Sequence, residues 1–219
     1  MTTEVKICGL RTQGALDAAL ASGADYVGFV FYERSPRNIA PADARLLAAR
    51  ARGKAKIVAL LVDPDDSLLA EVIDTVAPDI LQLHGSETPA RVAEIAQLFG
   101  RPVMKAVPVG SAGDVQAALA YAGKADRILF DAKAPADDAA ALPGGNGIAF
   151  DWQALAELEG RIDYMLAGGL NADNVAEAIR LTGAHAVDVS SGVESRPGEK
   201  DAELIRRFIH AAKTAKQTP

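Results

Sequence analysis

The sequence of 219 residues has little cysteine, few aromatic side chains and no long apolar run, and each shortage excludes a class of protein. A single cysteine cannot form an internal disulfide, which is typical of a reducing compartment. The longest apolar runs, such as residues 57–62, are too short to cross a bilayer. The first ten residues lack the charged-then-apolar pattern of a secretion signal. We therefore expect a cytoplasmic protein that does not contact membranes.

An excess of basic residues is also lacking. The chain has 23 Lys and Arg against 29 Asp and Glu, for a net charge of −6, and no basic stripe stands out. Nucleic acid is therefore not an expected partner. An anionic ligand would have to be held by local donors and helix ends, because the overall field does not attract it. The length suits one sizeable core, so we expect a single domain over residues 1–219.

Short apolar runs, rich in β-forming residues, alternate with amphipathic helical segments along the chain. Eight strand–helix units in strict alternation predict a parallel sheet with helical crossovers. Eight is the number that closes into a (β/α)8 barrel of the TIM type, and an open doubly wound sheet is the structural alternative. The predicted strands are residues 5–8, 26–31, 56–62, 80–84, 103–107, 127–131, 164–167 and 186–190.

The helical segments between these strands begin with residues that suit helix caps. A final helix is expected from about residue 201, and one long irregular segment, residues 132–147, follows the sixth strand. A long loop after a barrel strand lies at the catalytic face, where it can act as a lid. The expected capping residues are Thr12, Asp65, Thr88, Asp151 and Asn171.

Catalytic groups in a barrel lie at the carboxyl ends of strands, on inward positions that alternate with period two. Ionisable residues are costly there unless they are paired or used. The rule selects Lys6, Cys8, Gln82, His84, Asp131, Asp188 and Ser190.

Cys8 and Asp131 are the candidate base and acid of this set. A lone cysteine is usually a small core residue, but Cys8 ends a strand and shares a face with Lys6, whose charge favours the thiolate. Asp131 has two interpretations. It is either a helix cap or turn residue, or a carboxyl group that is shielded by the long loop and an apolar strand, so that it can keep its proton and act as an acid.

The remaining polar candidates have structural as well as functional interpretations. His84 is expected to be a supporting histidine that is hydrogen-bonded to the backbone. Asp188 can pair with Lys6, because the first and eighth strands are neighbours after closure. Arg37 is either a solvated surface residue or a fork for a carboxylate. One cysteine and three histidines without convergent spacing predict no metal site.

Glycine-rich segments after the seventh and eighth strands predict a phosphate site. Glycines allow backbone N–H groups to approach a phosphate, and helix N-termini favour its charge. A phosphate site in these two loops is frequent in barrels. The expected contacts are Gly168, Gly169, Ser190 and Ser191, with Gly145, Asn146 and Gly147 of the long loop as either a hinge or a further contact.

Several sequence motifs, most of them at strand ends, follow one another in order from residue 6 to residue 201. Together they resemble the phosphoribosylanthranilate isomerases, enzymes of tryptophan biosynthesis. The motifs are KICG, GFVF followed by SPR, LQLHG, ILFDAK, GGNGIAFDW, AGGLNADNV and VDVSSGVESRPGEKD.

The resemblance implies a (β/α)8 barrel and an Amadori rearrangement of N-(5-phosphoribosyl)anthranilate to the 1-deoxyribulose 5-phosphate isomer. It assigns Asp131 as the acid that protonates the furanose ring oxygen and Cys8 as the base that removes the C2 proton. It also implies that Arg37 contacts the anthranilate carboxylate. No cofactor is implied, because the substrate nitrogen serves as the electron sink, and the expected partner is this small molecule alone, bound by a monomer or homodimer.

Two alternatives are consistent with the fold. The related isomerase of histidine biosynthesis performs analogous chemistry on another phosphoribosyl aminoaldose, but uses two aspartates, so Cys8 argues against it. A phosphate-binding barrel without activity is the other alternative, and the presence of acid, base and both phosphate loops argues against that one.

Overall fold

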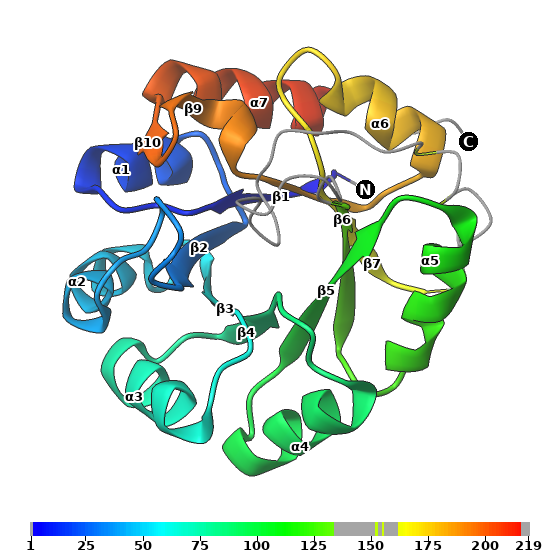
Figure 1. Cartoon of the computed structure of the whole chain (residues 1–219). Helices are drawn as coiled ribbons and strands as arrows, with labels where there is room; N and C mark the ends of the chain where they lie inside the picture. The colour runs from blue at the N-terminus through cyan, green and yellow to red at the C-terminus, as the bar shows by residue number, and fades with distance from the viewer. Residues whose placement is uncertain (1, 134–151, 153–154, 156–161, 216–219) are drawn as a thin grey trace.

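The computed structural model describes residues 2–133, 152, 155 and 162–215. Within them, eight parallel strands form a closed ring in sequence order, surrounded by helices (Figure 1). β1 (Glu4–Cys8) pairs with both β2 (Tyr26–Phe31) and β8 (Ala186–Val189). The predicted (β/α)8 barrel is therefore confirmed, and the open doubly wound sheet is excluded.

The strands lie close to their predicted positions. β5 and β6 extend one or two residues further than predicted, and β3, β4, β7 and β8 end one residue earlier. The other ring strands are β3 (Lys56–Leu61), β4 (Ile80–Leu83), β5 (Val103–Val109), β6 (Arg127–Ala132) and β7 (Tyr164–Leu166). The described helices are α1 (Gln13–Ala21), α2 (Pro41–Ala51), α3 (Asp66–Val76), α4 (Pro89–Phe99), α5 (Ala112–Ala118), α6 (Val175–Thr182) and α7 (Ala202–Thr214), with the 3-10 turns η1 (Leu119–Tyr121) and η3 (Ser191–Val193).

The capping residues are mostly those predicted. Thr12, Asp65 and Thr88 each accept a hydrogen bond from a backbone N–H in the first turn of α1, α3 and α4. Asp201 does the same for α7, and Asp151 lies outside the described residues.

The predicted start of α6 at Asn171 is wrong. The Asn171 side chain accepts hydrogen bonds from the backbone N–H groups of Asp173 and Asn174, at 2.9 and 3.2 Å. Asn174 in turn accepts from the Asn171 backbone and donates to the Gly169 carbonyl. These bonds form a closed turn, and the helix begins only at Val175.

The core has two parts, on either side of the strands. Between the ring and the helices lies a large apolar layer that includes Ile7, Phe29 and Phe208. Because successive side chains of a strand point to opposite faces, every second residue points into the ring. Val58, Leu129 and Met165 are among the side chains that pack there. Side chains of the described residues therefore fill the ring interior.

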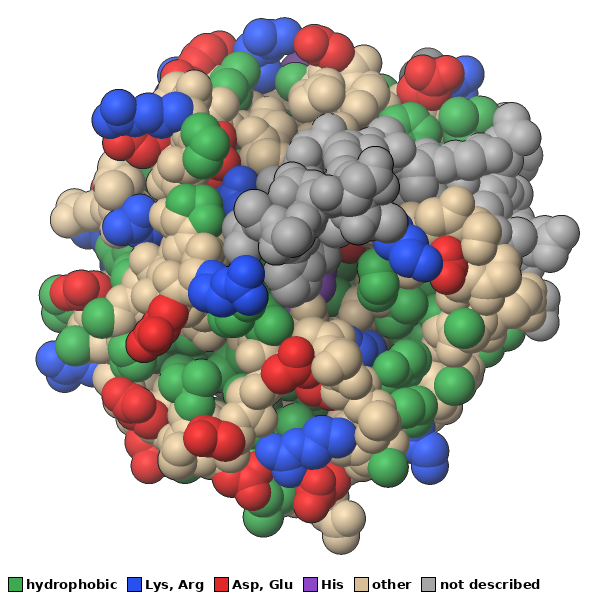
Figure 2. All heavy atoms as spheres, viewed as in Figure 1, with side chains coloured by type: hydrophobic (Ala, Val, Ile, Leu, Met, Phe, Trp, Pro, Cys, Tyr) green, Lys and Arg blue, Asp and Glu red, His purple; other side chains and the backbone are tan. Residues whose placement is uncertain are grey.

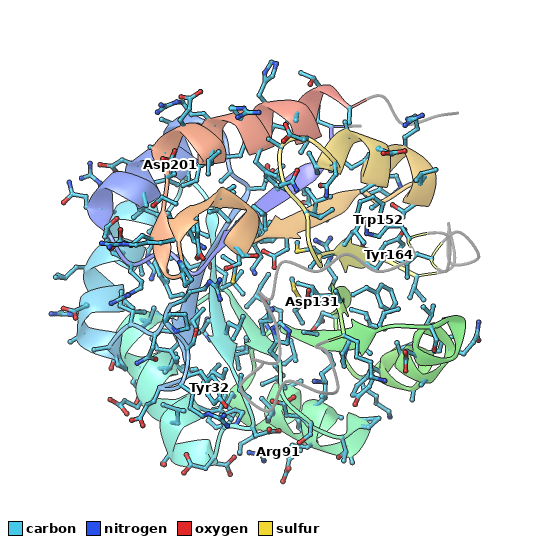
Figure 3. The ribbon with its side chains drawn as sticks, turned by 45° about the horizontal axis from the view of Figure 1, so that its top comes forward. Tyr32, Arg91, Asp131, Trp152, Tyr164 and Asp201 are labelled. Carbon is cyan, nitrogen blue, oxygen red and sulfur yellow. The ribbon has the colours of Figure 1, made fainter. Side chains whose placement is uncertain are left out.

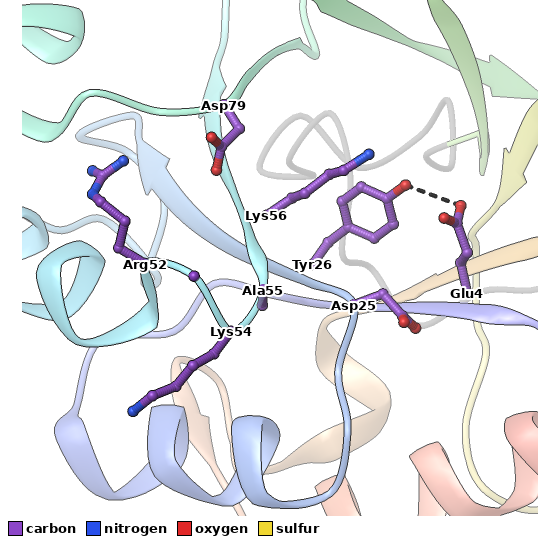
Figure 4. A pocket seen from close by; sticks show the side chains of 9 residues that line it. Glu4, Asp25, Tyr26, Arg52, Lys54, Ala55, Lys56 and Asp79 are labelled. Atoms are coloured by element: carbon purple, nitrogen blue, oxygen red, sulfur yellow. Dashed lines mark hydrogen bonds between the residues drawn. The ribbon is translucent and has the colours of Figure 1, made fainter.

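The amino end of the ring carries a polar network. Burial raises the pKa of Tyr26 to about 12, and its hydroxyl donates to Glu4 at 2.9 Å (Figure 4). A pocket of about 440 Å³ borders Tyr26, Lys56 and Asp79. It lies at the amino ends of the strands, the end of a barrel that serves stability rather than catalysis. On the opposite face, acidic and basic side chains are interspersed around the rim (Figure 2).

Candidate active site

Cys8 lies inside the carboxyl end of the ring, as its position in β1 predicts. Its thiol is buried with 3% exposure, and the Lys6 side chain lies on the same face one period below. A Cβ atom on Gly28 would lie 3.1 Å from Cys8 Sγ and 3.4 Å from Lys6 Cε. Gly28 therefore makes the space in which the two side chains meet, a role that sequence reasoning did not assign to it.

Lys6 forms the predicted ion pair with Asp188. Its Nζ donates to Asp188 Oδ1 at 2.9 Å, and the two residues are register partners in the β1–β8 ladder. Asp188 raises the pKa of Lys6 even though burial opposes it. The Lys6 ammonium is therefore charged, and its charge is largely balanced by Asp188.

Lys6 favours the Cys8 thiolate, as expected, but other effects on the thiol outweigh it. Burial raises the pKa of the Cys8 thiol above its ordinary value, and nearby Asp188 raises it further. Lys6 and Lys200 act in the opposite direction without overcoming these effects. The buried thiol is thus held in its protonated form more firmly than a free cysteine.

Asp131 lies next to the last residue of β6, and Figure 3 shows it near the centre of the barrel. Its carboxyl group is buried, accepts from the Ala132 backbone N–H at 2.9 Å, and lies 3.3 Å from His84 Nε2. His84 Nδ1 lies 3.3 Å from the Gln82 side-chain nitrogen. His84 therefore supports Asp131 through side chains, and within the described part of the chain the expected hydrogen bond from its ring to the backbone is not found.

Arg37 is buried, so its interpretation as a solvated surface residue is wrong. Its Nε and Nη2 atoms donate to the two carboxylate oxygens of Glu194, at 2.8 and 2.9 Å. A Cβ atom on Gly9 would lie 2.8 Å from Arg37 Cδ, so the side chain crosses the backbone directly after Cys8. Glu194, which sequence reasoning missed, comes from a short hairpin of β9 (Glu194–Arg196) and β10 (Glu199–Lys200).

The same hairpin brings a second missed residue, Lys200, into the site. Its buried Nζ donates to Glu194 Oε1 at 2.6 Å and to the carbonyl and hydroxyl oxygens of Ser190, at 3.0 and 3.1 Å. The Ser190 hydroxyl in turn donates to the Cys8 carbonyl at 3.2 Å. The hairpin thereby connects Arg37 with the strand ends at Cys8 and Ser190.

The loops after β7 and β8 lie against each other. Gly168 and Gly169 both have positive φ, 84° and 65°, which favours glycine. A Cβ on Gly192, next to Ser191, would lie 1.9 Å from the Leu170 carbonyl oxygen, so the two loops pack backbone to backbone. The predicted phosphate-loop residues are therefore adjacent in space, whereas Gly145, Asn146 and Gly147 lie outside the described residues.

The arrangement is suited to acid–base chemistry on an anion. A thiol and a carboxyl group face the mouth of the ring from β1 and β6, with β7 and β8 between them in ring order. Three buried cations, Lys6, Arg37 and Lys200, lie on the β1 side. Over residues 2–133 and 162–215, we find neither a cluster of His, Cys, Asp and Glu that fits a metal ion nor a helix long and apolar enough to span a membrane.

Comparisons with known proteins agree with this geometry. The model of the N-(5'-phosphoribosyl)anthranilate (PRA) isomerase family matches residues 5–211. The N-(5'-phosphoribosyl)anthranilate isomerase of Rhizobium meliloti (strain 1021) is 57% identical over 215 residues, 98% of this chain and 99% of that protein. The structure of the phosphoribosyl anthranilate isomerase from Thermotoga maritima superposes with a TM-score of 0.87 at 37% identity, over 96% of this chain and 98% of that one.

A second solved structure shows a phosphoribosyl anthranilate isomerase in complex with reduced 1-(o-carboxyphenylamino)-1-deoxyribulose 5-phosphate. It superposes with a TM-score of 0.84 at 36% identity, over 96% of this chain and 98% of that one. Both the sequence match and the superposition extend over nearly the whole chain. The chain therefore belongs to the N-(5'-phosphoribosyl)anthranilate isomerase family.

Proposed function

We propose that this chain is a cytoplasmic, single-domain isomerase of tryptophan biosynthesis. It converts N-(5-phosphoribosyl)anthranilate into 1-(2-carboxyphenylamino)-1-deoxyribulose 5-phosphate by an Amadori rearrangement. The observation that carries the proposal is the pair of buried groups, Cys8 and Asp131, at the carboxyl ends of β1 and β6 in a chain of this family.

Asp131 is the general acid of the proposed reaction. It gives its proton to the furanose ring oxygen, the C1–O bond breaks, and the anthranilate nitrogen supplies the electron pair that forms the Schiff base. The contact of Asp131 with His84 Nε2 and the bond from the Ala132 N–H fix the direction of its carboxyl group. Proton transfer needs such a fixed, hydrogen-bonded group within reach of the reacting atom.

Cys8 is the general base. Its thiolate removes the C2 proton of the Schiff base, the C2 electron pair forms the enolamine, and the electrons of the C=N bond return to nitrogen. The enolamine then tautomerises to the ketone. The raised pKa of Cys8 makes the thiolate scarce at neutral pH but strongly basic once formed, because the same burial that disfavours the charge raises its proton affinity.

The two anionic ends of the substrate have separate contacts. Gly168, Gly169, Ser190 and Ser191 bind the phosphate through backbone N–H groups and hydroxyls, and the touching loops after β7 and β8 support this assignment. Arg37 binds the anthranilate carboxylate. The burial of Arg37 beside Gly9, next to the proposed base, supports it.

Substitution of the two reacting groups tests the mechanism. Cys8→Ala and Asp131→Asn are each expected to lower kcat by about 10²–10⁴-fold with little change in substrate binding, because general acid–base steps contribute that much. Turnover is followed by the loss of anthranilate fluorescence. Wild-type activity in Cys8→Ala would remove Cys8 as the base.

The same assay separates the proposal from the two alternatives. Faster turnover of the histidine-pathway aminoaldose than of the anthranilate substrate would favour the other isomerase. Tight binding of both substrates without turnover of either would favour a barrel that has kept its phosphate site but has no activity. The oligomeric state, monomer or homodimer, stays a prediction that ultracentrifugation can check.

A further inference from the structure

Gln82 is a buried polar residue that neither the fold nor the proposed reaction has so far explained. It lies in β4, two residues before His84 and on the same face, and its exposure is 0%. Its register partners on the neighbouring strands, Leu60 of β3 and Met104 of β5, are both apolar. Its Oε1 atom is buried and has no hydrogen-bond partner among the described residues. An unsatisfied buried oxygen is unfavourable, so stability is a weak reason for an amide in this layer.

The other end of the amide contacts His84. Gln82 Nε2 lies 3.3 Å from His84 Nδ1. An amide nitrogen carries two N–H donors and does not accept a hydrogen bond, so Nδ1 must be the acceptor in this contact. In a neutral imidazole one ring nitrogen accepts and the other carries the proton. Gln82 therefore selects the tautomer of His84 that has its proton on Nε2.

The protonated nitrogen of this tautomer faces the proposed acid. His84 Nε2 lies 3.3 Å from Asp131 Oδ2, and the Ala132 N–H donates to Asp131 Oδ1 at 2.9 Å. A carboxyl group has about two acceptor sites on each oxygen. Within the described part of the chain, each oxygen of Asp131 thus receives one N–H donor and keeps one further site.

The tautomer of His84 decides where the acid can carry its proton. When Nε2 bears a hydrogen, the Asp131 proton cannot lie between Oδ2 and His84, so it occupies one of the two remaining sites. A ligand can accept it there. In the opposite tautomer Nε2 would be an acceptor, and the carboxyl proton would be hydrogen-bonded to His84 instead. That proton would then have to leave His84 before it could reach a substrate.

We propose that Gln82 is a positioning residue that holds His84 in the Nε2–H tautomer and so keeps the Asp131 proton directed away from His84, toward the substrate. This inference rests on the proposed function, in particular on Asp131 as the general acid. Gln82 acts through His84 and does not touch the reacting atoms. The unsatisfied Oε1 is the consequence of using an amide, rather than an apolar side chain, for its single donor contact.

Two substitutions of Gln82 test the role in the full chain. Gln82→Met keeps the length of the side chain but removes the donor, and Gln82→Glu presents an acceptor to Nδ1 and so favours a proton there. For Gln82→Met, kcat is expected to fall by about 10–100-fold, less than the 10²–10⁴-fold of losing the acid, because the carboxyl group remains. KM should stay within about threefold. The Tm should be equal or higher, because the unsatisfied oxygen is gone.

NMR of the ring nitrogens reads the tautomer without any turnover. The chain has three histidines, so ¹⁵N labelling of histidine gives few resonances, and His84→Asn identifies those of His84 by their loss. The wild type is expected to show an unprotonated Nδ1 and a protonated Nε2, and Gln82→Glu should reverse the two. The matched control is Gln97→Glu on the exposed face of α4, which should change neither kcat nor the His84 resonances.

The outcomes separate positioning from a structural role and from failure of the proposed function. A protonated Nδ1 in the wild type, or wild-type kcat in Gln82→Met, overturns the role of Gln82. A fall in the Tm of Gln82→Met together with its kcat shows a structural role and overturns it as well. A wild type that does not turn over the anthranilate substrate contradicts the proposed function instead. Gln82→Met decides the question if Gln82→Glu does not fold.

Discussion

Removing the Lys6 charge should destabilise the protein far more than a typical single substitution. Lys6 is fully buried, and its Nζ lies 2.9 Å from Asp188 Oδ1, across the β1–β8 ladder. Lys6→Met keeps a side chain of similar length but leaves the buried carboxylate without its cation. Breaking one side of a buried ion pair costs about 3–5 kcal/mol in the free energy of unfolding, and Asp188→Asn should cost a similar amount.

The two substitutions should not add. The double variant Lys6→Met/Asp188→Asn buries no unpaired charge, so its loss of stability should be smaller than the sum of the single losses by about 1–3 kcal/mol. Urea unfolding followed by circular dichroism measures all four proteins. A loss of 3–5 kcal/mol in a chain of this length corresponds to a fall in Tm of about 6–20 °C. Single losses that add to within about 0.5 kcal/mol would refute the reasoning.

Two further predictions concern the mouth of the barrel. Because Cys8 is the single cysteine, a ¹³C label on its β-carbon gives one NMR resonance, whose titration midpoint should lie above the ordinary thiol value of about 8.5. Since the thiolate is the base, kcat/KM should rise with pH toward that midpoint, and a midpoint below 8.5 would contradict the effect of burial. Gly168→Ala should destabilise the protein more than Gly53→Ala and should weaken inhibition by inorganic phosphate. Both glycines have positive φ, 84° and 76°, so both substitutions strain the backbone. At Gly168, however, the added Cβ would also lie 2.5 Å from the Ala132 backbone nitrogen, whereas the space at Gly53 is open. Equal losses of stability in thermal unfolding would contradict this difference.

The sequence was sufficient for the ring and for most of the helix starts. Apolar β-rich runs mark all eight strands because each is covered on both faces, which gives continuous runs that are easy to recognise. Side-chain caps such as Thr12 and Asp65 act within three residues, so local sequence is enough to find them. Asn171 misled the prediction because the same side chain that caps a helix also closes a turn, and only the positions of Asn174 and Gly169 decide between the two.

The site was predicted only in part. Cys8, Asp131 and Asp188 follow from period two and strand ends, and the structure places them inside the ring. Glu194 and Lys200 lie in strands of three and two residues without apolar alternation, so no periodicity indicates that they are buried. The pKa of Cys8 depends on the balance between burial and charges from three strands. It could not be predicted from the position of Lys6 alone.

Closure of the ring also has a consequence for protein synthesis. Lys6 and Asp188 are 182 residues apart, and Arg37 and Glu194 are 157 apart, so the last part of the chain completes contacts begun at its start. Synthesis at about 5–20 residues per second leaves the edge of β1 that pairs with β8 open for many seconds before β8 emerges. A chain that stops before residue 186 lacks β8, the second partner of β1, and also lacks the hairpin that holds Arg37. Such a chain has no complete site and exposes strand edges that favour aggregation, so activity reports that translation reached the end of the barrel.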